Sequence, residues 1–326
     1  MKSFPLKPSK LKLMLGVAML VATTSAMAAY PDKPITVLVG YGGGGGADTI
    51  ARMYADGIAK ALNAAVIVEN KPGAGGTLAA STVARAAPDG YTLMVAPTAV
   101  FTITPNVRKT TYNPIKDFTP ISTLATGMDV LILSKTVPAN NISEFVAQAK
   151  KNPGKYSYAS SGLATSTHLM GVVFAEAAGI DMLHVPYKSS SEYLPDLIEG
   201  RVSMAFDPVL LGQVAGGKLK LMGIAADKRE PAYPDAQTTK EAGIDMAFAY
   251  DKLWYGLVGP AGLPAEIVAR LSAAVEKISK DPAIAKKLAT TGMQPKAITG
   301  KDFAEKIKVD SKYYGDLINK LDLKLE

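Results

Sequence analysis

Short apolar runs alternate with longer segments of helical period along most of this chain, and this alternation limits the possible fold more than any other feature. Strands that alternate with helices usually pair in a parallel sheet with helices on its faces. The pattern therefore predicts an α/β fold with mostly parallel sheet. The expected strands are Ile35–Val39, Val66–Val68, Tyr91–Val95, Val130–Leu133, Tyr156–Ala159, Met182–Val185, Val202–Phe206, Lys220–Ala225 and Trp254–Val258. The expected helices are Thr49–Leu62, Thr77–Ala86, Ser143–Lys150, Thr167–Ala178, Leu194–Glu199, Ala265–Lys280, Pro282–Thr290 and Lys301–Lys320.

Residues 1–28 have the three parts of a secretory signal peptide. Four lysines precede the apolar run LMLGVAMLVA, and Ala26-Met27-Ala28 supplies the small residues that a signal peptidase needs. The apolar run is shorter than the roughly 20 residues of a membrane-spanning helix, which argues against a permanent anchor. We expect cleavage after Ala28 and release of the mature chain into the periplasm.

The composition argues against several kinds of site. Without the four lysines of the leader, 32 basic residues stand against 29 acidic ones, and a net charge of +3 does not suggest nucleic-acid binding. The chain has no cysteine and two histidines, which argues against a disulfide framework, a thiolate nucleophile and a zinc site. We expect neither a metal nor a cofactor.

A glycine-rich loop follows the first expected strand. Its residues 40–45 satisfy the pattern G-x-G-x-x-G, and Glu69 lies where a dinucleotide-binding unit places a ribose-binding acid. A phosphate-binding P-loop would end in lysine, whereas this loop ends in Gly46-Ala47-Asp48. Backbone amides at a helix N-terminus can also hold a carboxylate, and a turn without any ligand is a further alternative. Since an exported protein meets no free nicotinamide pool, we favour the carboxylate.

A second loop repeats this arrangement. A strand, a loop of small residues and a helix start occur at 35–50 and again at 156–168. We expect Asp48 and Ser166 to be the N-caps of the two helices, because Asp and Ser oxygens accept the free amides of a first turn. The other amides of the two loops would then face a ligand.

Seven stretches match one known family: YPDKPITVLVGYGGGGGADTIAR, VIVENKPGAGGTLAASTVARAAPDGYTLM, YNPIKDFTPIS, NPGKYSYASSG, STHLMGVVFAEAAGIDMLHVPYKSS, GRVSMAFD and WYGLVGPAGLPAEIVARL. The chain resembles the Bug, or tripartite tricarboxylate transporter receptor, family of periplasmic solute-binding proteins. The resemblance implies a two-lobed, type II-like binding protein with a ligand cleft between two α/β lobes. One lobe would span 30–126 plus 252–326, and the other 127–251.

The resemblance also implies a function. Such proteins bind small organic acids, aromatic acids or amino acids, and they deliver them to two integral membrane transporter subunits without a chemical step. The loops expected to grip the carboxylate are Tyr41–Asp48 and Ser160–Thr167. We expect a monomeric receptor of this kind. The alternatives are a ligand-binding partner of a membrane signalling kinase and an exported NAD-dependent oxidoreductase.

Three segments differ from the usual family pattern. Tyr41 is followed by glycines where the family commonly has two prolines, and Ala47 stands where a hydroxyl residue is common. After HVPYK, the common Gly-Ser-Ala-Pro-Ala is replaced by Ser189-Ser190-Ser191-Glu192-Tyr193. These changes lie in or near the expected cleft.

The residues expected to contact the ligand are Tyr41, Gly43, Gly44, Gly45, Asp48, Thr98, Ser160, Ser161, Gly162, Thr165, Ser166, Thr167 and Asp207. Two of them have an alternative structural role. Tyr41 would either stack on the ligand or cover the end of its strand, and Asp207 would either accept a hydrogen bond from the ligand or cap the turn before Pro208. We expect His168 and His184 to have core or hydrogen-bonding roles, since neither has a partner suited to catalysis nearby.

Overall fold

The computed structural model describes residues 30–250 and 252–322. The chain divides into two units, Met1–Asp32 and Lys33–Glu326. Only Tyr30–Asp32 of the first unit are described, and the expected signal peptide at 1–28 lies outside the described residues. All the described helices and strands belong to the second unit, and none of these helices is long and apolar enough to cross a membrane.

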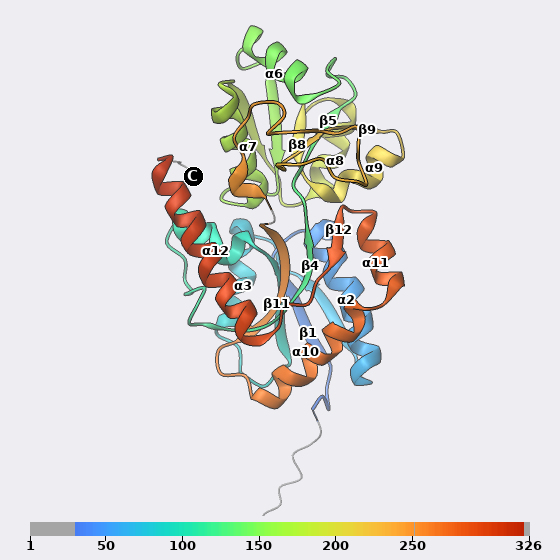
Figure 1. Cartoon of the computed structure of the whole chain (residues 1–326). Helices are drawn as coiled ribbons and strands as arrows, with labels where there is room; N and C mark the ends of the chain where they lie inside the picture. The colour runs from blue at the N-terminus through green and yellow to red at the C-terminus, as the bar shows by residue number, and fades with distance from the viewer. Residues whose placement is uncertain (1–29, 251, 323–326) are drawn as a thin grey trace, which may run out of the picture. The chain divides into compact units, whose positions relative to one another are not determined.

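One sheet of the second unit has the strand order β12-β4-β11-β3-β1-β2. Figure 1 shows it in the lower half of the view, with α10 and α12 near β11 and β4. Its strands are β1 Ile35–Val39, β2 Val66–Asn70, β3 Thr92–Pro97, β4 Phe118–Gly127, β11 Leu253–Pro260 and β12 Met293–Pro295. The longer helices packed around it are α2 Gly46–Leu62, α3 Thr77–Ala84, α10 Ala265–Ser279, α11 Pro282–Ala289 and α12 Gly300–Lys320.

The other sheet has the strand order β10-β9-β5-β8-β6-β7, drawn in the upper half of Figure 1. Its strands are β5 Val130–Ser134, β6 Tyr156–Ser160, β7 Met182–Pro186, β8 Met204–Phe206, β9 Leu219–Ile224 and β10 Gln237–Thr238. Its helices include α6 Ile142–Lys151, α7 Ser166–Ala178, α8 Ser190–Glu199 and α9 Leu211–Ala215. The two-lobed α/β architecture expected from the sequence is confirmed.

Both sheets contain antiparallel pairs. The second sheet is mostly parallel, as the alternation predicts, with three parallel pairings out of five, whereas the first has two out of five. In the first sheet β1 is parallel to β2 and β3, whereas β11 is antiparallel to β3 and β4. In the second sheet β6 is parallel to β7 and β8, whereas β5 is antiparallel to β8 and β9. The reversals occur where the chain passes from one sheet to the other, between β4 and β5, and where it returns as β11.

Strand β4 has no counterpart among the expected strands. Its middle carries Ser122 and Thr123, which are fully buried and interrupt the apolar pattern. Both hydroxyls are satisfied by main-chain oxygens, since Ser122 donates to the carbonyl of Thr123 and Thr123 donates to that of Lys296. Buried polar groups of this kind carry no signal in a hydrophobic pattern.

The two expected N-caps are wrong, because both helices begin earlier than predicted. Gly45 is the N-cap of α2, which places Asp48 inside the first turn. Thr165 is the N-cap of α7, and its hydroxyl accepts a hydrogen bond from the amide of His168 at 3.4 Å. Ser166 is therefore the first helical residue and has no capping role.

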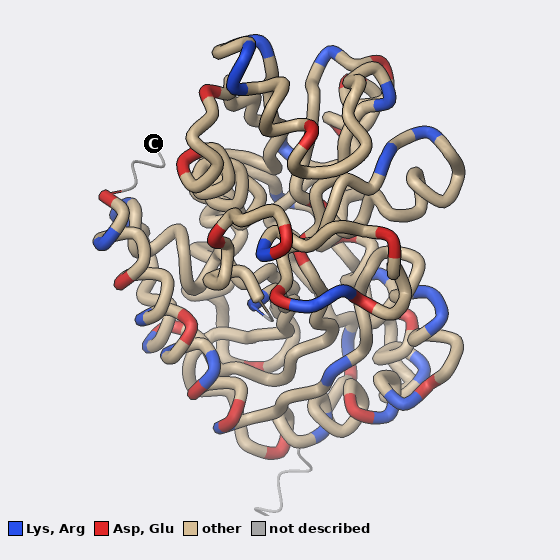
Figure 2. The backbone as a smooth tube through the Cα atoms, turned by 45° about the horizontal axis from the view of Figure 1, so that its top comes forward, with Lys and Arg blue, Asp and Glu red and all other residues tan. Residues whose placement is uncertain are grey.

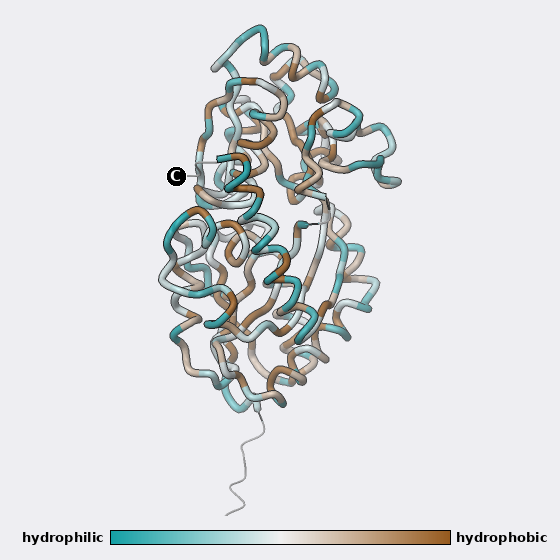
Figure 3. Tube along the Cα trace, turned by 60° about the vertical axis from the view of Figure 1, so that its left-hand side comes forward, coloured by the Kyte–Doolittle hydropathy of each residue, from teal (hydrophilic) through white to brown (hydrophobic). Residues whose placement is uncertain are grey.

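The hydrophobic core of the second sheet includes residues from segments next to the first sheet. Ala99 and Ile103 pack in one cluster with Phe145 and Phe174, and so do Tyr314 and Ile318 of α12. Figure 3 shows the hydrophobic stretches of the chain inside the two lobes, with hydrophilic stretches along the outer helices. Figure 2 shows acidic and basic residues interspersed along α12, where ion pairs such as Lys312–Asp316 form at 2.6 Å.

Candidate functional site

The N-terminal ends of three helices meet at one cavity. Residues 45–47 belong to the start of α2, residues 165–167 to the start of α7, and Ser189 and Ser190 to the start of α8. The first amides of a helix have no partner inside the helix, and its N-terminus carries a partial positive charge. The cavity therefore offers backbone donors and a favourable potential for an anion.

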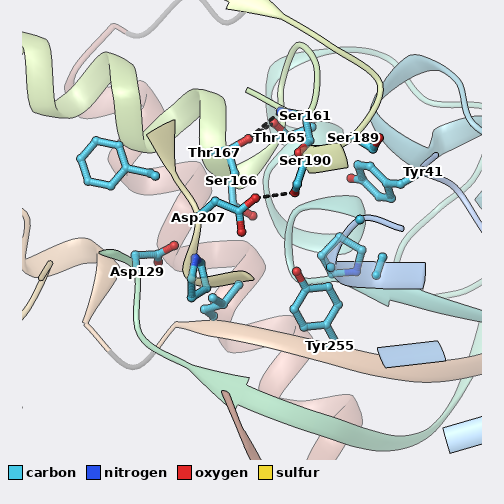
Figure 4. A pocket seen from close by; sticks show the side chains of 17 residues that line it. Tyr41, Asp129, Ser161, Thr165, Ser166, Thr167, Ser189, Ser190, Asp207 and Tyr255 are labelled. Atoms are coloured by element: carbon cyan, nitrogen blue, oxygen red, sulfur yellow. Dashed lines mark hydrogen bonds between the residues drawn. The ribbon is translucent and has the colours of Figure 1, made fainter. Parts of the chain in front are cut away.

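The cavity has a volume of about 50 Å³. This is room for roughly four water molecules, or for a small organic group of similar size. Within the part of the chain that the structure describes, no lysine, arginine or histidine lines it. Figure 4 shows the hydroxyls of Ser161, Ser166, Thr167 and Ser190 gathered on one side and the carboxyl of Asp129 on the other. The full lining is Tyr41, Gly45, Gly46, Ala47, Pro97, Asp129, Ser161, Thr165, Ser166, Thr167, Ser189, Ser190, Phe206, Asp207, Pro208, Leu253 and Tyr255.

Asp48 holds the glycine loop in place through hydrogen bonds to its carboxylate. Its carboxylate accepts hydrogen bonds from the amide of Gly44 at 2.8 Å, from Arg52 at 3.0 Å and from Asn70 at 2.8 Å. Burial favours the neutral acid, but these three donors and the charge of Arg52 together hold the pKa of Asp48 below its usual value. Asp48 does not line the cavity. Its carboxylate is already satisfied, so its role is to position the loop.

Tyr41 lies just after β1 and lines the cavity, and its stacking on a ligand stays a prediction. Its hydroxyl donates to the carbonyl of Gly75 at 3.0 Å. A second cavity of about 170 Å³ adjoins the first through Tyr41 and Ser161. Arg108 and Lys188 lie on the wall of this second cavity, and Arg108 donates to the carbonyl of Ala74.

Two histidines support the second loop. His184 forms a hydrogen bond with the hydroxyl of Ser160 at 2.6 Å, and Nδ1 of His168 accepts from the amide of Ala164 at 3.2 Å. The two imidazole rings stack with their centroids 3.9 Å apart. Burial lowers the pKa of His168 to about 3, with a smaller contribution from His184, and burial lowers that of His184 to about 4. Both rings are neutral near pH 7, and their predicted hydrogen-bonding role is confirmed.

The hydroxyls of α7 hold the loop that precedes it. Thr167 accepts from the amide of Ser161 at 2.9 Å and shares a hydrogen bond with Thr165 at 3.1 Å. Thr165 also donates to the carbonyl of Gly162 at 2.7 Å. Because these bonds connect the loop to the helix start, Ser161, Thr165 and Thr167 reach the cavity together with Ser166.

The glycine loop touches the serine segment 189–191 of the other lobe. The amide of Gly42 donates to the carbonyl of Lys188 at 3.3 Å, and the hydroxyl of Ser191 donates to the carbonyl of Gly43 at 2.7 Å. A Cβ atom on Gly42 would lie 2.8 Å from Oγ of Ser189, so a larger residue at position 42 would force Ser189 to shift. The glycines and the serines, two departures from the family pattern, are therefore in contact. This contact also covers part of the loop that matches a dinucleotide template.

Two buried carboxyl groups reach the cavity. Oδ1 of Asp207 accepts from the amide of Val209 at 3.0 Å, as the expected cap of the turn before Pro208, and Oδ2 accepts from Ser190 and Tyr193. Burial raises the pKa of Asp207 even though these donors lower it. Asp129 is 5% exposed, and burial together with the charge of Asp207 raises its pKa to about 7.

The structure brings together only part of the expected site. Tyr41, Gly45, Ser161, Thr165, Ser166, Thr167 and Asp207 line the cavity. The other six do not line it: Gly43, Gly44, Asp48, Thr98, Ser160 and Gly162. Thr98 was expected at the crevice from its place after a parallel strand, yet it is 1% exposed and its hydroxyl bonds to Trp254 and Lys252. The preceding residue, Pro97, lines the cavity instead.

Several lining residues are not among the expected ligand contacts. The sequence places the serine segment only near the cleft, and it predicts no role for Tyr255 or Asp129. Tyr255 comes from β11, and its hydroxyl oxygen would lie 2.8 Å from a Cβ placed on Gly46. The one available signal for Asp129 was a single acid directly before the apolar run VLIL, a place where a carboxyl needs a structural or functional reason.

Residues 50–323 match the model of the tripartite tricarboxylate transporter family receptor. The chain belongs to this family. This is a family of solute-binding proteins and not a family of enzymes, and the resemblance read from the sequence is confirmed.

Individual members of the receptor family cover almost the whole chain. A UPF0065 protein of Bordetella pertussis is 34% identical over 98% of this chain and 99% of its own length. The structure of MatC from Rhodopseudomonas palustris with bound malate has a TM-score of 0.81 at 31% identity, over 89% of this chain and 100% of its own. A second R. palustris protein, with adipate, has a TM-score of 0.85 at 26% identity, over 90% of this chain and 98% of its own.

Proposed function

We propose that this chain is a periplasmic receptor that captures a small carboxylate between its lobes and presents it to the membrane subunits of a tripartite tricarboxylate-type transporter. The observation that carries the proposal is the meeting of three helix N-termini at a cavity whose lining, within residues 30–250 and 252–322, has no basic side chain. Backbone amides and hydroxyls would neutralise the ligand carboxylate there, each charge-assisted hydrogen bond contributing roughly 1.5–3 kcal/mol. Malate and adipate, bound by two members of the family, are both carboxylates.

Binding would act through closure of the lobes. The start of α2 follows β1 of the first sheet, whereas the starts of α7 and α8 follow β6 and β7 of the second. A ligand that touches all three helix ends does so only when the lobes are together, so it shifts the population towards the closed state. No chemical step is involved. The membrane subunits would then recognise the closed form.

The first experiment is a screen for the ligand class. Thermal unfolding is measured with organic acids, aromatic acids and amino acids, and mass spectrometry identifies any carboxylate that co-purifies with the protein. Calorimetry on the best ligand then compares Gly44→Val with Gly243→Val. Both glycines have a positive φ, +76° and +73°, so the backbone strain is alike, but only Gly44 lies in the cleft loop.

We expect the Gly44 variant to lose binding while both variants keep a folded structure by circular dichroism. Undiminished affinity in the Gly44 variant would contradict the role of the loop. Deletion of the gene tests the delivery step, because loss of uptake supports a transport receptor. Loss of transcriptional induction with normal uptake would instead point to a sensor.

A further inference from the structure

Asp129 and Asp207 lie at the same end of the second sheet. Asp129 immediately precedes β5 and Asp207 immediately follows β8, two antiparallel strands in which Leu131 is paired with Phe206. The amide of Asp207 donates to the carbonyl of Val130 at 3.1 Å, and the amide of Ala225 donates to the carbonyl of Asp129 at 2.8 Å. The backbone positions of both residues are therefore set by sheet hydrogen bonds, and both side chains line the cavity (Figure 4).

The two carboxyl groups differ in their partners. Asp207 receives hydrogen bonds from Ser190, Tyr193 and the amide of Val209. Asp129 is 5% exposed, and among the described residues its side chain has neither a hydrogen-bond donor nor an ion-pair partner. No fully buried side-chain oxygen among the described residues lacks a hydrogen-bond partner, so the carboxyl of Asp129 is open to the cavity, and a cation or donor bound there would stabilise its charged form.

A ligand group that complements both acids in their ionised form carries positive charge. Among the residues that the structure describes, the lining contains two acids and no base, and the charge of Asp207 acts on Asp129. A hydroxyl group supplies one hydrogen bond and no charge, whereas a protonated amine supplies three hydrogen bonds and one positive charge. The amine is the better complement to an unpartnered acid beside a second acid.

We propose that the ligand of this receptor is a carboxylate that also carries a protonated amine, with its carboxylate at the three helix ends and its amine at Asp129 and Asp207. This inference rests on the proposed function and narrows it to amino acids and related zwitterions. It also separates this chain from its two relatives bound to malate and adipate, since neither of those ligands has an amine.

Matched pairs of probes test the proposal. Calorimetry at pH 7.5 compares alanine with propanoate, aspartate with succinate and glutamate with glutarate, on protein unfolded and refolded to remove bound ligand. In at least one pair we expect the amino acid to bind about tenfold more tightly or better, the size of a charge-assisted hydrogen bond. Asp129→Asn should lose about the same factor for that amino acid and keep its affinity for the partner without the amine. Asp56→Asn, an exposed change on α2, is the control.

Proton exchange during binding gives a second readout that a merely structural role would not change. An amine that binds ionised Asp129 lowers its pKa, so protons are released near pH 7, as seen by calorimetry in buffers of different ionisation enthalpy. A carboxylate that accepts a hydrogen bond from protonated Asp129 would cause proton uptake. The other titratable groups facing Asp129 are Asp207, Tyr255 of β11 and Tyr314 of α12, and burial keeps both tyrosines neutral.

Three results would overturn the inference: amino acids that bind no better than their partners, an unaffected Asp129→Asn variant, or proton uptake on binding. If the acids without an amine bind and depend on Gly44, the carboxylate receptor stands and only the inference fails. If no carboxylate binds in either series, the proposed function fails as well.

Discussion

Replacing Asp129 with asparagine is expected to stabilise the ligand-free protein, and to do so more strongly as the pH rises. Asp129 is 5% exposed, and its carboxyl has no donor among the described residues. Burial, and then the charge of Asp207, raise its pKa from 3.8 to about 7. Asparagine keeps the size of the side chain and removes the charge that the site penalises.

The size of the effect follows from proton linkage. A pKa that is higher in the folded state means that the folded chain binds the proton more tightly than the unfolded chain. The resulting stabilisation is complete below the unfolded pKa of 3.8, and it is lost as the pH rises through about 7. A difference of about 3 units corresponds to about 4 kcal/mol in total, of which about 2 kcal/mol is lost between pH 5.5 and pH 8.5.

Urea unfolding of refolded protein at these two pH values measures the effect. The free energy of unfolding of Asp129→Asn minus that of the wild type should rise by about 2 kcal/mol from pH 5.5 to pH 8.5. The same difference for Asp56→Asn should stay constant, because Asp56 is exposed. A constant difference for Asp129→Asn, or one that falls with pH, would refute the reasoning that Asp129 is a buried acid without an internal partner.

Three further changes test other parts of the site. Gly42→Ala places a Cβ 2.8 Å from Oγ of Ser189, so calorimetry with the best-binding carboxylate should show roughly 5- to 150-fold weaker binding, and Ser189→Gly in the same chain should restore it. Because the pKa of His168 is lowered from 6.5 to about 3 in the folded chain, the wild type loses stability as the pH falls below 6.5 towards 3. In urea unfolding, the free energy of unfolding of His168→Gln minus that of the wild type should therefore rise by about 2 kcal/mol from pH 7.5 to pH 5. An unchanged difference would contradict a buried neutral ring. Asp48→Asn should speed hydrogen exchange at the amide of Gly44, whose acceptor is the Asp48 carboxylate, and unaltered exchange would show that the loop is held by other contacts.

Most strands could be predicted because their signal is local. Strand β1 has the predicted bounds, and the predicted β5 and β6 are each one residue short, since these strands are mostly buried and read as continuous apolar runs. Strand β4 was missed because Ser122 and Thr123 are buried with main-chain partners. The main chain of Thr123 pairs with β11, and its hydroxyl bonds to Lys296, more than 100 residues away, and no local pattern contains that information.

The candidate site shows the same division. The two loops were predicted, since a small-residue loop between a strand and a helix is visible in the sequence, and parts of both line the cavity. The roles of the individual acids could not be predicted from the sequence. Asp48 lies in the glycine loop but binds Arg52 and Asn70, whereas Asp129 lies outside both predicted loops and faces the cavity.

The sequence by itself determined the α/β class, the family and the two loops, because apolar periodicity, glycine content and motif order are properties of neighbouring residues. Only the tertiary structure decided which side chains of those loops face the cavity, which helix ends meet there, and that Asp129 joins Asp207. The physical reason is that burial and electrostatic environment depend on strand register and on the crossing between the sheets. One residue of register separates a side chain that lines the cavity from one that faces the opposite side of the sheet.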